Sequence, residues 1–454
     1  MLGLCEFEPA PERDQRAGFA ALSARAISLR DLAYGREDPF VAVMPFERDA
    51  AGVWRASRWI GRFRHDNQEY AIKPRIGDTL FQRIAVDAVA AALLPDGASP
   101  GVSRLGTMLD LLPLVWCLAL RRAQRQQGIP RLYVPRSADD RVSLRGRLDL
   151  PRQLIKNRFA QHHLACRWSE LSVDNPLNRV ILRTIDHLRV AGRFPFANQG
   201  AEFARELQGL RTQLELHGTR QCAVNQDYVV RWTRGNDRYR LVYNLSLAIL
   251  RRGGAESVPA SGEAILLDSA EIWELFLFRR LQSVIQSERR EDLRIEWPRE
   301  RRTAPRMLLE WNGFPTRMLI PDIIVTESDG NARSGILDAK YRRFVSPIED
   351  HDIADQMALY AMTADAAVRP PSPSKAVPQP TMLLLYPQAK ASRSALGLNS
   401  GLPAGSLGEG RLLFDGQPAR LIAWCVPLSD NEANFDQTVT ANLGELLSVA
   451  FPEG

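Results

Sequence analysis

Residues 321–327 read PDIIVTE and residues 334–341 read SGILDAKY, and these two stretches decide the fold of the C-terminal half. Each contains a short run of apolar residues, and the turn-forming sequence DGN lies between them, so we predict a β-hairpin. Because side chains alternate along a strand, Asp338 and Lys340 lie on one face of the second strand. Asp322 begins the first strand. The hairpin therefore brings two carboxylates and one ammonium group together.

Two carboxylates beside a lysine suit metal-assisted attack on a phosphodiester. Mg²⁺ prefers one or two carboxylates, with water or phosphate oxygens completing its coordination. Held by Asp322 and Asp338, it would lower the pKa of a bound water and stabilise charge on the phosphate. Lys340 could orient or deprotonate that water. Asp-x-Lys also occurs by chance, but only five of the 59 basic residues are lysines, so a lysine at this place is informative.

Further polar residues extend this candidate site. Glu274 lies in an apolar helix that we predict to begin at Ser269, and Glu271, about one turn earlier, is the alternative acid. A second helix, predicted for about residues 350–364, places Gln356 and Tyr360 on one face. The predicted catalytic set is Asp322, Asp338, Lys340, Glu274, Gln356 and Tyr360, with Asp322, Asp338 and Glu274 as metal ligands.

The whole chain reads as an α+β protein of three regions. At 454 residues it exceeds one ordinary domain of about 150 residues. Residues 1–105 alternate in the manner of half-buried strands and predict a strand-rich N-terminal domain. Residues 106–260 contain helical apolar stripes and predict a mostly helical middle domain. Residues 261–454 contain the candidate site.

Composition excludes several classes of protein. The five cysteines are scattered with no C-x-x-C pair, which argues against a structural zinc site or a disulfide framework. The most apolar stretch, residues 105–120, contains Asp110, so we expect no membrane span. The N-terminus lacks the pattern of a signal peptide, so we expect a cytoplasmic location. The net charge of +6 is compatible with a polyanionic partner but is weak evidence for one.

The order of these motifs resembles that of a known family. A carboxylate on a helix, a hairpin with Asp and Asp-x-Lys, and a helix with Gln-x-x-x-Tyr follow one another as in the PD-(D/E)XK nucleases. Across about residues 54–430 the sequence resembles the McrC family, the nuclease subunits of McrBC modification-dependent restriction systems. The segments that carry this resemblance are WIGRF (59–63), YAIKPRIG (70–77), LRGRLD (144–149), LSVDNPLNR (171–179), IPDIIV (320–325), ILDAKY (336–341) and LLLYP (383–387).

The sequence also departs from the McrC pattern. Arg75 stands where the family has lysine. Residues 273–276 read WELF, which is closer to less characterised relatives than to the usual form. The sub-family therefore stays open.

The resemblance implies a C-terminal PD-(D/E)XK restriction-endonuclease-like core, a mixed sheet flanked by helices. It implies a DNA endonuclease that uses Mg²⁺, with Mn²⁺ as an alternative ion. It further implies a hetero-oligomer with a McrB-type AAA+ GTPase that recognises modified DNA and translocates. The sequence itself contains no Gly-Lys dipeptide and hence no P-loop. By analogy, the N-terminal and middle regions would dock the partner.

Two other hypotheses remain open at this point. In the first, the chain is a non-catalytic activator or docking subunit of an AAA+ motor. In the second, suggested by the Gln356-x-x-x-Tyr360 pair, it is a RecB-like exonuclease, which needs a DNA end.

Overall fold

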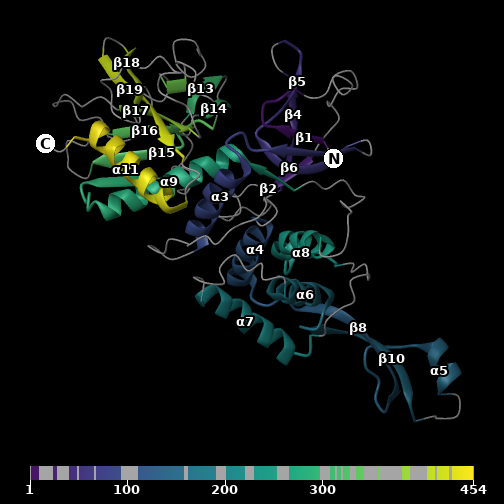
Figure 1. Cartoon of the computed structure of the whole chain (residues 1–454). Helices are drawn as coiled ribbons and strands as arrows, with labels where there is room; N and C mark the ends of the chain where they lie inside the picture. Colours follow the sequence, from purple (N-terminus) through teal and green to yellow (C-terminus); the bar gives the residue numbers. More distant parts are fainter. Residues whose placement is uncertain are drawn as a thin grey trace. The chain divides into compact units, whose positions relative to one another are not determined.

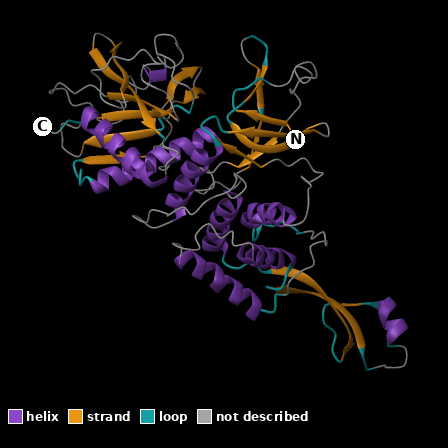
Figure 2. Ribbon diagram, in the orientation of Figure 1, coloured by secondary structure: helices purple, strands orange, loops and turns teal. Residues whose placement is uncertain are grey.

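A computed structural model of the chain (Figure 1) divides by residue contacts into two compact units, residues 1–99 with 261–454, and residues 100–260. Both units combine helices and strands (Figure 2), which confirms the predicted α+β class. The structure describes residues 2–9, 24–27, 40–48, 51–65, 68–93, 111–157, 162–190, 201–219, 230–252, 265–296, 307–311, 314–318, 321–327, 334–341, 356–357, 381–388, 406–414, 417–428 and 432–452.

A six-stranded mixed sheet organises the C-terminal part of the first unit, in the order β12-β15-β16-β17-β19-β18. The predicted hairpin is confirmed, since β15 and β16 pair antiparallel with Ile323 opposite Leu337. β16, β17 and β19 run parallel, and β17 is buried along most of its length, as parallel strands usually are. The strand bounds are β12 Leu293–Glu296, β15 Ile323–Glu327, β16 Ser334–Ala339, β17 Thr381–Gln388, β18 Ser406–Phe414 and β19 Gln417–Pro427.

A second six-stranded sheet, in the order β1-β7-β6-β11-β2-β3, is built mostly from the N-terminal region. β11 lies between β6 and β2, antiparallel to the first and parallel to the second. A strand formed by residues 265–268 thus completes a sheet whose other strands come from residues 2–73. The strand bounds are β1 Leu2–Cys5, β2 Ala24–Ile27, β3 Phe40–Val43, β6 Trp59–His65, β7 Gln68–Lys73 and β11 Ile265–Asp268; β4 Phe46–Arg48 and β5 Trp54–Ala56 form a separate hairpin.

The helix α9, Ser269–Ser287, follows β11 without a break. The sequence predicts a cap at Asp268 or Ser269, and Asp268 provides it: its side chain accepts hydrogen bonds from the backbone N–H groups of Ala270 and Glu271, at 3.0 and 3.3 Å. α9 packs against α3 (Asp78–Leu93), α11 (Glu432–Ala450) and β16. One helix therefore contacts elements from both ends of the chain.

The described residues of the second unit form a group of helices, α4, α6, α7 and α8, and an extended arm. α4 and α6 both pack against α8, and α7 packs against α6. The helix bounds are α4 Leu111–Gln127, α6 Pro176–Val190, α7 Ala201–Leu216 and α8 Arg240–Arg252. The arm consists of the sheet β8-β10-β9 with the short helix α5; its bounds are β8 Leu132–Arg141, β9 Arg147–Leu148, α5 Leu150–Lys156 and β10 Leu164–Ser172.

The strands of the arm were absent from the predicted helical middle region. Side chains of β8 alternate between half-buried and exposed, but Arg136 is on the half-buried face and Tyr133 on the exposed one, so apolar and polar residues do not alternate along the sequence. The predicted limits of this region, residues 106 and 260, lie close to those of the second unit. Residues 1–99, predicted as a separate domain, share the first unit with residues 261–454.

Other predictions had mixed outcomes. With Asn312-Gly313 as a turn, the sequence predicts a hairpin of residues 306–311 and 316–320, and β13 (Met307–Trp311) and β14 (Phe314–Met318) pair as one, whereas β18 and α11 were missed. Phe435, Val439, Leu443 and Leu447 are buried at helical spacing and could have identified α11. Of the predicted helix at about 350–364, only residues 356–357 are described, and they are helical. Among the helices described, none combines the length and the apolar character that crossing a membrane requires.

A buried polar cluster joins the two sheets of the first unit. Glu6, directly after β1, is buried and accepts a hydrogen bond from the backbone N–H of Arg75 at 3.0 Å. The Arg75 guanidinium lies over the ring of Tyr341, 5.0 Å from its centre, just beyond β16. Burial raises the pKa of Glu6 to about 7, against the opposing interactions with Ser269 and Arg75. Glu6 is therefore protonated in the folded chain at pH values where an unfolded chain ionises it.

The pKa of Glu6 predicts a pH-dependent effect of Glu6→Gln. As pH rises from 4.5 to about 7, Glu6 lowers the unfolding free energy of the wild-type protein. The reason is that Glu6 loses its proton in the unfolded chain but keeps it in the folded chain. The neutral amide avoids this loss of stability. Glu6→Gln should equal wild type near pH 4.5 and exceed it at pH 8 by about 3 kcal/mol in unfolding free energy.

Urea unfolding at the two pH values measures this difference. Glu8→Gln, at an exposed position next to β1, is the matched control and should leave the pH profile of wild type unchanged. A Glu6→Gln protein that is no more stable than wild type at pH 8 would contradict the prediction.

Candidate functional site

Asp322 and Asp338 meet at the ends of paired strands. The register that sets Ile323 opposite Leu337 continues to this pair of aspartates. The Asp322 carboxylate accepts a hydrogen bond from the backbone N–H of Ala339 at 2.9 Å, which fixes it against β16. The Asp338 side chain is almost fully buried. The predicted convergence of these two carboxyl groups is therefore present.

Lys340 lies between a carboxylate and an amide. Its Nζ atom is 2.5 Å from Oδ2 of Asp338 and donates a hydrogen bond to Oε1 of Gln356 at 2.8 Å. The backbone N–H of Lys340 donates to the carbonyl of Leu385 in β17 at 2.9 Å, which holds the chain in place beyond β16. Lys340 is thus held by contacts from three separate segments, two to its ammonium group and one to its backbone.

The electrostatics of Asp338 differ from those of an exposed aspartate. Burial, and after it the nearby charge of Asp322, raise the pKa of Asp338 to about 7. Lys340 opposes both effects. Such a group takes up a proton near neutrality unless more positive charge is present. A divalent cation between the two aspartates would supply that charge.

Helix α9 brings two acidic side chains to the same cavity. Glu271 and Glu274 are both buried, and both line it together with Asp322 and Asp338. The indole N–H of Trp273 donates to the carbonyl of Leu385 at 3.3 Å and fixes α9 against β17. The choice between Glu274 and Glu271 as the completing acid stays open.

The cavity has a volume of about 430 Å³ and is also lined by the N-terminal region. Phe7, Glu47 and Arg58 contribute to its wall, although they precede the hairpin by more than 250 residues. No spacing or motif in the sequence links them to the site. They reach it because β11 lies in the N-terminal sheet and leads directly into α9.

Four of the six predicted site residues line this cavity, namely Asp322, Asp338, Lys340 and Glu274. Gln356 joins them through its hydrogen bond to Lys340. Tyr360 lies outside the described residues. The predicted set is therefore brought together as far as the structure describes it.

The donors of this cavity fit a hard divalent cation. They are carboxylate oxygens, with no thiolate or imidazole among the lining residues, which suits Mg²⁺ or Mn²⁺. Within the described residues, no three acidic, histidine or cysteine side chains form an assembled metal cluster. Mg²⁺ commonly binds through one or two carboxylates, with water and substrate phosphate as its other ligands. Asp322 and Asp338 meet that requirement.

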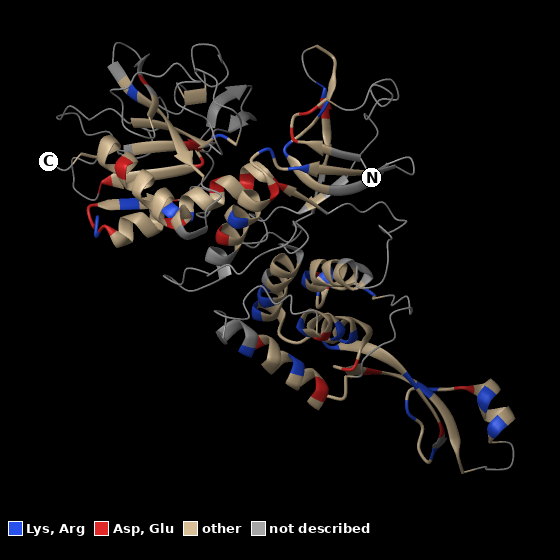
Figure 3. Ribbon diagram, in the orientation of Figure 1, with Lys and Arg blue, Asp and Glu red and all other residues tan. Residues whose placement is uncertain are grey.

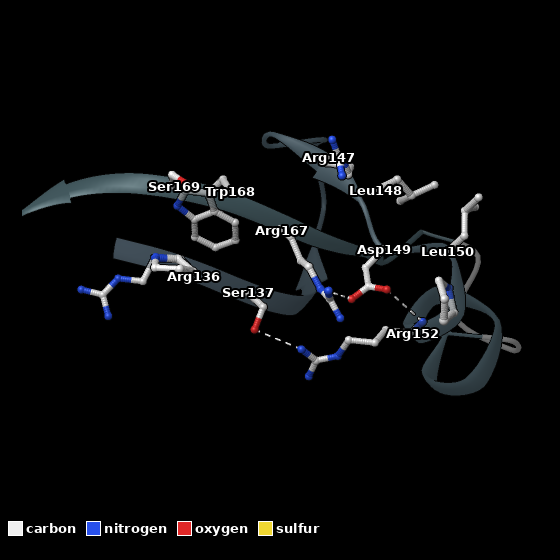
Figure 4. Close-up of a pocket in the computed structure, with 12 residues that line it drawn as sticks. Arg136, Ser137, Arg147, Leu148, Asp149, Leu150, Arg152, Arg167, Trp168 and Ser169 are labelled. Atoms are coloured by element: carbon white, nitrogen blue, oxygen red, sulfur yellow. Dashed lines mark hydrogen bonds and ion pairs between the residues drawn. The ribbon is translucent and has the colours of Figure 1, made fainter. Parts of the chain in front are cut away.

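The arm has a different kind of concave surface, shown in Figure 4, of about 880 Å³. Arg152 donates to Ser137 and pairs with Asp139, both at 3.0 Å, which attaches α5 to β8. Asp149 pairs with Arg167 across the same surface. The only carboxylate among the lining residues is thus neutralised by an arginine. This surface is basic and offers nothing to hold a metal.

Comparisons with known proteins identify the family. The family described as "McrBC 5-methylcytosine restriction system component" matches residues 65–387, well over half of the chain. No curated protein matches.

Two solved structures from Thermococcus gammatolerans show similarity to this chain. One is the refined half-complex from the tetradecameric assembly of McrB AAA+ hexamers with bound McrC, at 16% identity and a TM-score of 0.44, covering 98% of this chain and 99% of that one. The other is the McrBC complex, at 18% identity and a TM-score of 0.29, covering 63% and 88%. At these TM-scores neither adds detail about the site. The family match, over residues that include the Asp322–Asp338–Lys340 cluster, shows that the chain belongs to the McrBC restriction system component family.

Proposed function

We propose that this chain is the nuclease subunit of its McrBC-type restriction system, a Mg²⁺-dependent DNA endonuclease with a PD-(D/E)XK core. The observation that carries the proposal is the cluster of Asp322, Asp338 and Lys340 in one carboxylate-lined cavity. Burying the Asp338 carboxyl group beside that of the half-buried Asp322 costs free energy, and a purely structural role would be served better by apolar side chains. Binding of a catalytic metal ion accounts for this cluster of carboxyl groups.

Each residue has a role that follows from its contacts. Asp322 and Asp338, with Glu274 or Glu271, would hold Mg²⁺. When bound, Mg²⁺ supplies Lewis-acid stabilisation of the phosphate and activation of water. Lys340 orients the attacking water and offsets charge on the phosphate, and its contacts with Asp338 and Gln356 keep its Nζ atom in place.

The same proposal includes an AAA+ GTPase partner. The chain has no P-loop sequence of its own, so nucleotide-driven translocation must come from another subunit. Membership of the McrBC family supports a McrB-type partner, and the complex is then a hetero-oligomer. Recognition of modified DNA belongs to that partner.

We infer that the arm is the surface that docks the partner. Apolar side chains of α5 and its neighbouring loop are exposed, including Leu144, Leu150, Leu154 and Ile155. Residues 132–172 contain eight Lys or Arg and four Asp or Glu, so they carry most of the net charge of the chain. Figure 3 shows basic residues along the arm. An apolar and basic projection fits a partner surface with an apolar centre and an acidic rim.

The catalytic proposal predicts the effect of two substitutions. Asp338→Asn and Lys340→Ala should slow Mg²⁺-dependent cleavage of methylated plasmid by at least about 100-fold, because each removes a group that acts at the phosphate. The assay contains the partner and GTP, and cleavage is followed on gels. Stimulation of the partner's GTPase by the chain should persist, because the arm is unchanged.

Matched controls are available in the same unit. Lys73→Ala removes an exposed lysine at the end of β7, and Glu409→Gln removes an exposed glutamate of β18. Both should cut as wild type does. If Asp338→Asn and Lys340→Ala also cut at the wild-type rate, the chain is not the nuclease.

The docking proposal predicts a separate loss. The double substitution Leu154→Asp, Ile155→Asp places charge on the exposed face of α5 and should weaken association with the GTPase by at least about 10-fold. Gel filtration and GTPase stimulation measure this. Leu216→Asp, at an equally exposed leucine on α7, is the control and should leave association intact. Unchanged association of the α5 variant would place the interface elsewhere.

A further inference from the structure

Arg58 lies between β5 and β6 and is tied to the start of α9. Its backbone carbonyl accepts hydrogen bonds from the N–H and the hydroxyl of Ser269, at 3.1 and 2.9 Å. Its Nε atom is 3.3 Å from Oδ2 of Asp268, the residue that caps α9. The N-terminal sheet therefore holds this arginine at the helix that carries Glu271 and Glu274.

The charges that line the cavity are unequal in number. Six lining residues are acidic, whereas Arg58 and Lys340 are the two basic ones among the described residues. The acidic residues are Glu47, Asp268, Glu271, Glu274, Asp322 and Asp338. A polyanion that enters such a cavity meets strong repulsion unless cations contact it.

The two basic side chains differ in exposure. Lys340 is 17% exposed and is held by Asp338 and Gln356 in the interior of the site. The Arg58 side chain is 53% exposed. The ion pair with Asp268 uses the Nε atom of Arg58, and the guanidinium carries further N–H donors on its two Nη atoms. Arg58 is thus the cation placed to meet a phosphate from the solvent side.

We propose that Arg58 binds a backbone phosphate of the DNA strand, next to the phosphate that is cut. This inference rests on the proposed nuclease function. Arginine suits the role, because its planar fork can donate two parallel hydrogen bonds to one phosphate. Asp268 orients the fork. The N-terminal sheet then contributes directly to substrate binding.

The experiment must distinguish phosphate binding by Arg58 from a purely structural role of its side chain. Arg58 could serve only to secure the start of α9 through Asp268. Its backbone hydrogen bonds to Ser269 do not depend on its side chain. The buried Asp268 carboxylate keeps its two backbone hydrogen bonds at the start of α9 in any Arg58 variant, and the half-exposed guanidinium contributes little to stability. Variants of Arg58 should accordingly melt within about 2 °C of wild type.

Salt dependence of DNA binding distinguishes the two roles. The full chain is titrated against a fluorescent DNA duplex with Ca²⁺ in place of Mg²⁺. Loss of one phosphate contact lowers the slope of log Kd against log salt by about 1. Arg58→Ala and Arg58→Gln should both show this lower slope and bind about 5- to 10-fold more weakly at low salt. Arg58→Lys, which keeps the charge, should keep the slope.

An arginine outside the cavity serves as the control for DNA affinity and its salt dependence. Arg420→Ala, at a partly exposed arginine paired with Glu409 and absent from the cavity lining, should leave both quantities unchanged. In cleavage assays with the partner, Arg58→Ala should raise KM more than it lowers kcat. If Arg58→Gln binds DNA with the wild-type affinity and slope, the inference is overturned.

The two proposals can fail separately. If cleavage depends on Asp338 while the Arg58 variants bind like wild type, only the inference about Arg58 fails. If the slope changes as expected while no protein cuts DNA, the catalytic proposal fails and Arg58 remains a phosphate contact.

Discussion

Two aspartates that would repel one another are forced together by strand pairing. The register of β15 and β16 sets Asp322 against Asp338, and the surrounding apolar residues exclude much of the water that would screen them. Lys340 compensates part of this charge, and Gln356 and the backbone of β17 fix Lys340 in turn. The other features of the first unit either support this cluster or give access to it.

Helix α9 is the main support. It begins at the end of one sheet, contacts β16 of the other, and brings Glu271 and Glu274 to the aspartates. Arg280 on its far half pairs with Asp87 of α3 and Asp436 of α11, which ties together helices from the two ends of the chain. These ion pairs help to fix the orientation of α9, and the orientation of α9 determines where Glu271 and Glu274 lie.

The sequence predicted the local parts of this arrangement better than the distant ones. The hairpin, the cap of α9 and the cluster of Asp322, Asp338 and Lys340 depend on alternation and on turn residues, which are visible in a short window. Arg58 and Phe7 could not be found in this way, because a long-range strand pairing brings them to the cavity. The arm was missed for a different reason: the half-buried face of β8 holds Arg136 and its exposed face holds Tyr133, so apolar and polar residues do not alternate along the sequence.

The place of β11 has a consequence for synthesis on the ribosome. The strands β1, β7 and β6 lie on one side of it and β2 and β3 on the other, so the N-terminal sheet is in two pieces until residues 265–268 have been made. At about 5–20 residues per second, the nearly 200 residues between β7 and β11 take on the order of 10–40 seconds to appear. Residues 100–260 emerge in that interval and can fold as a unit. Until β11 has been made, the edges of β6 and β2 remain unpaired. The nascent chain is thus at greatest risk of mispairing before the helix that carries the acids has left the ribosome.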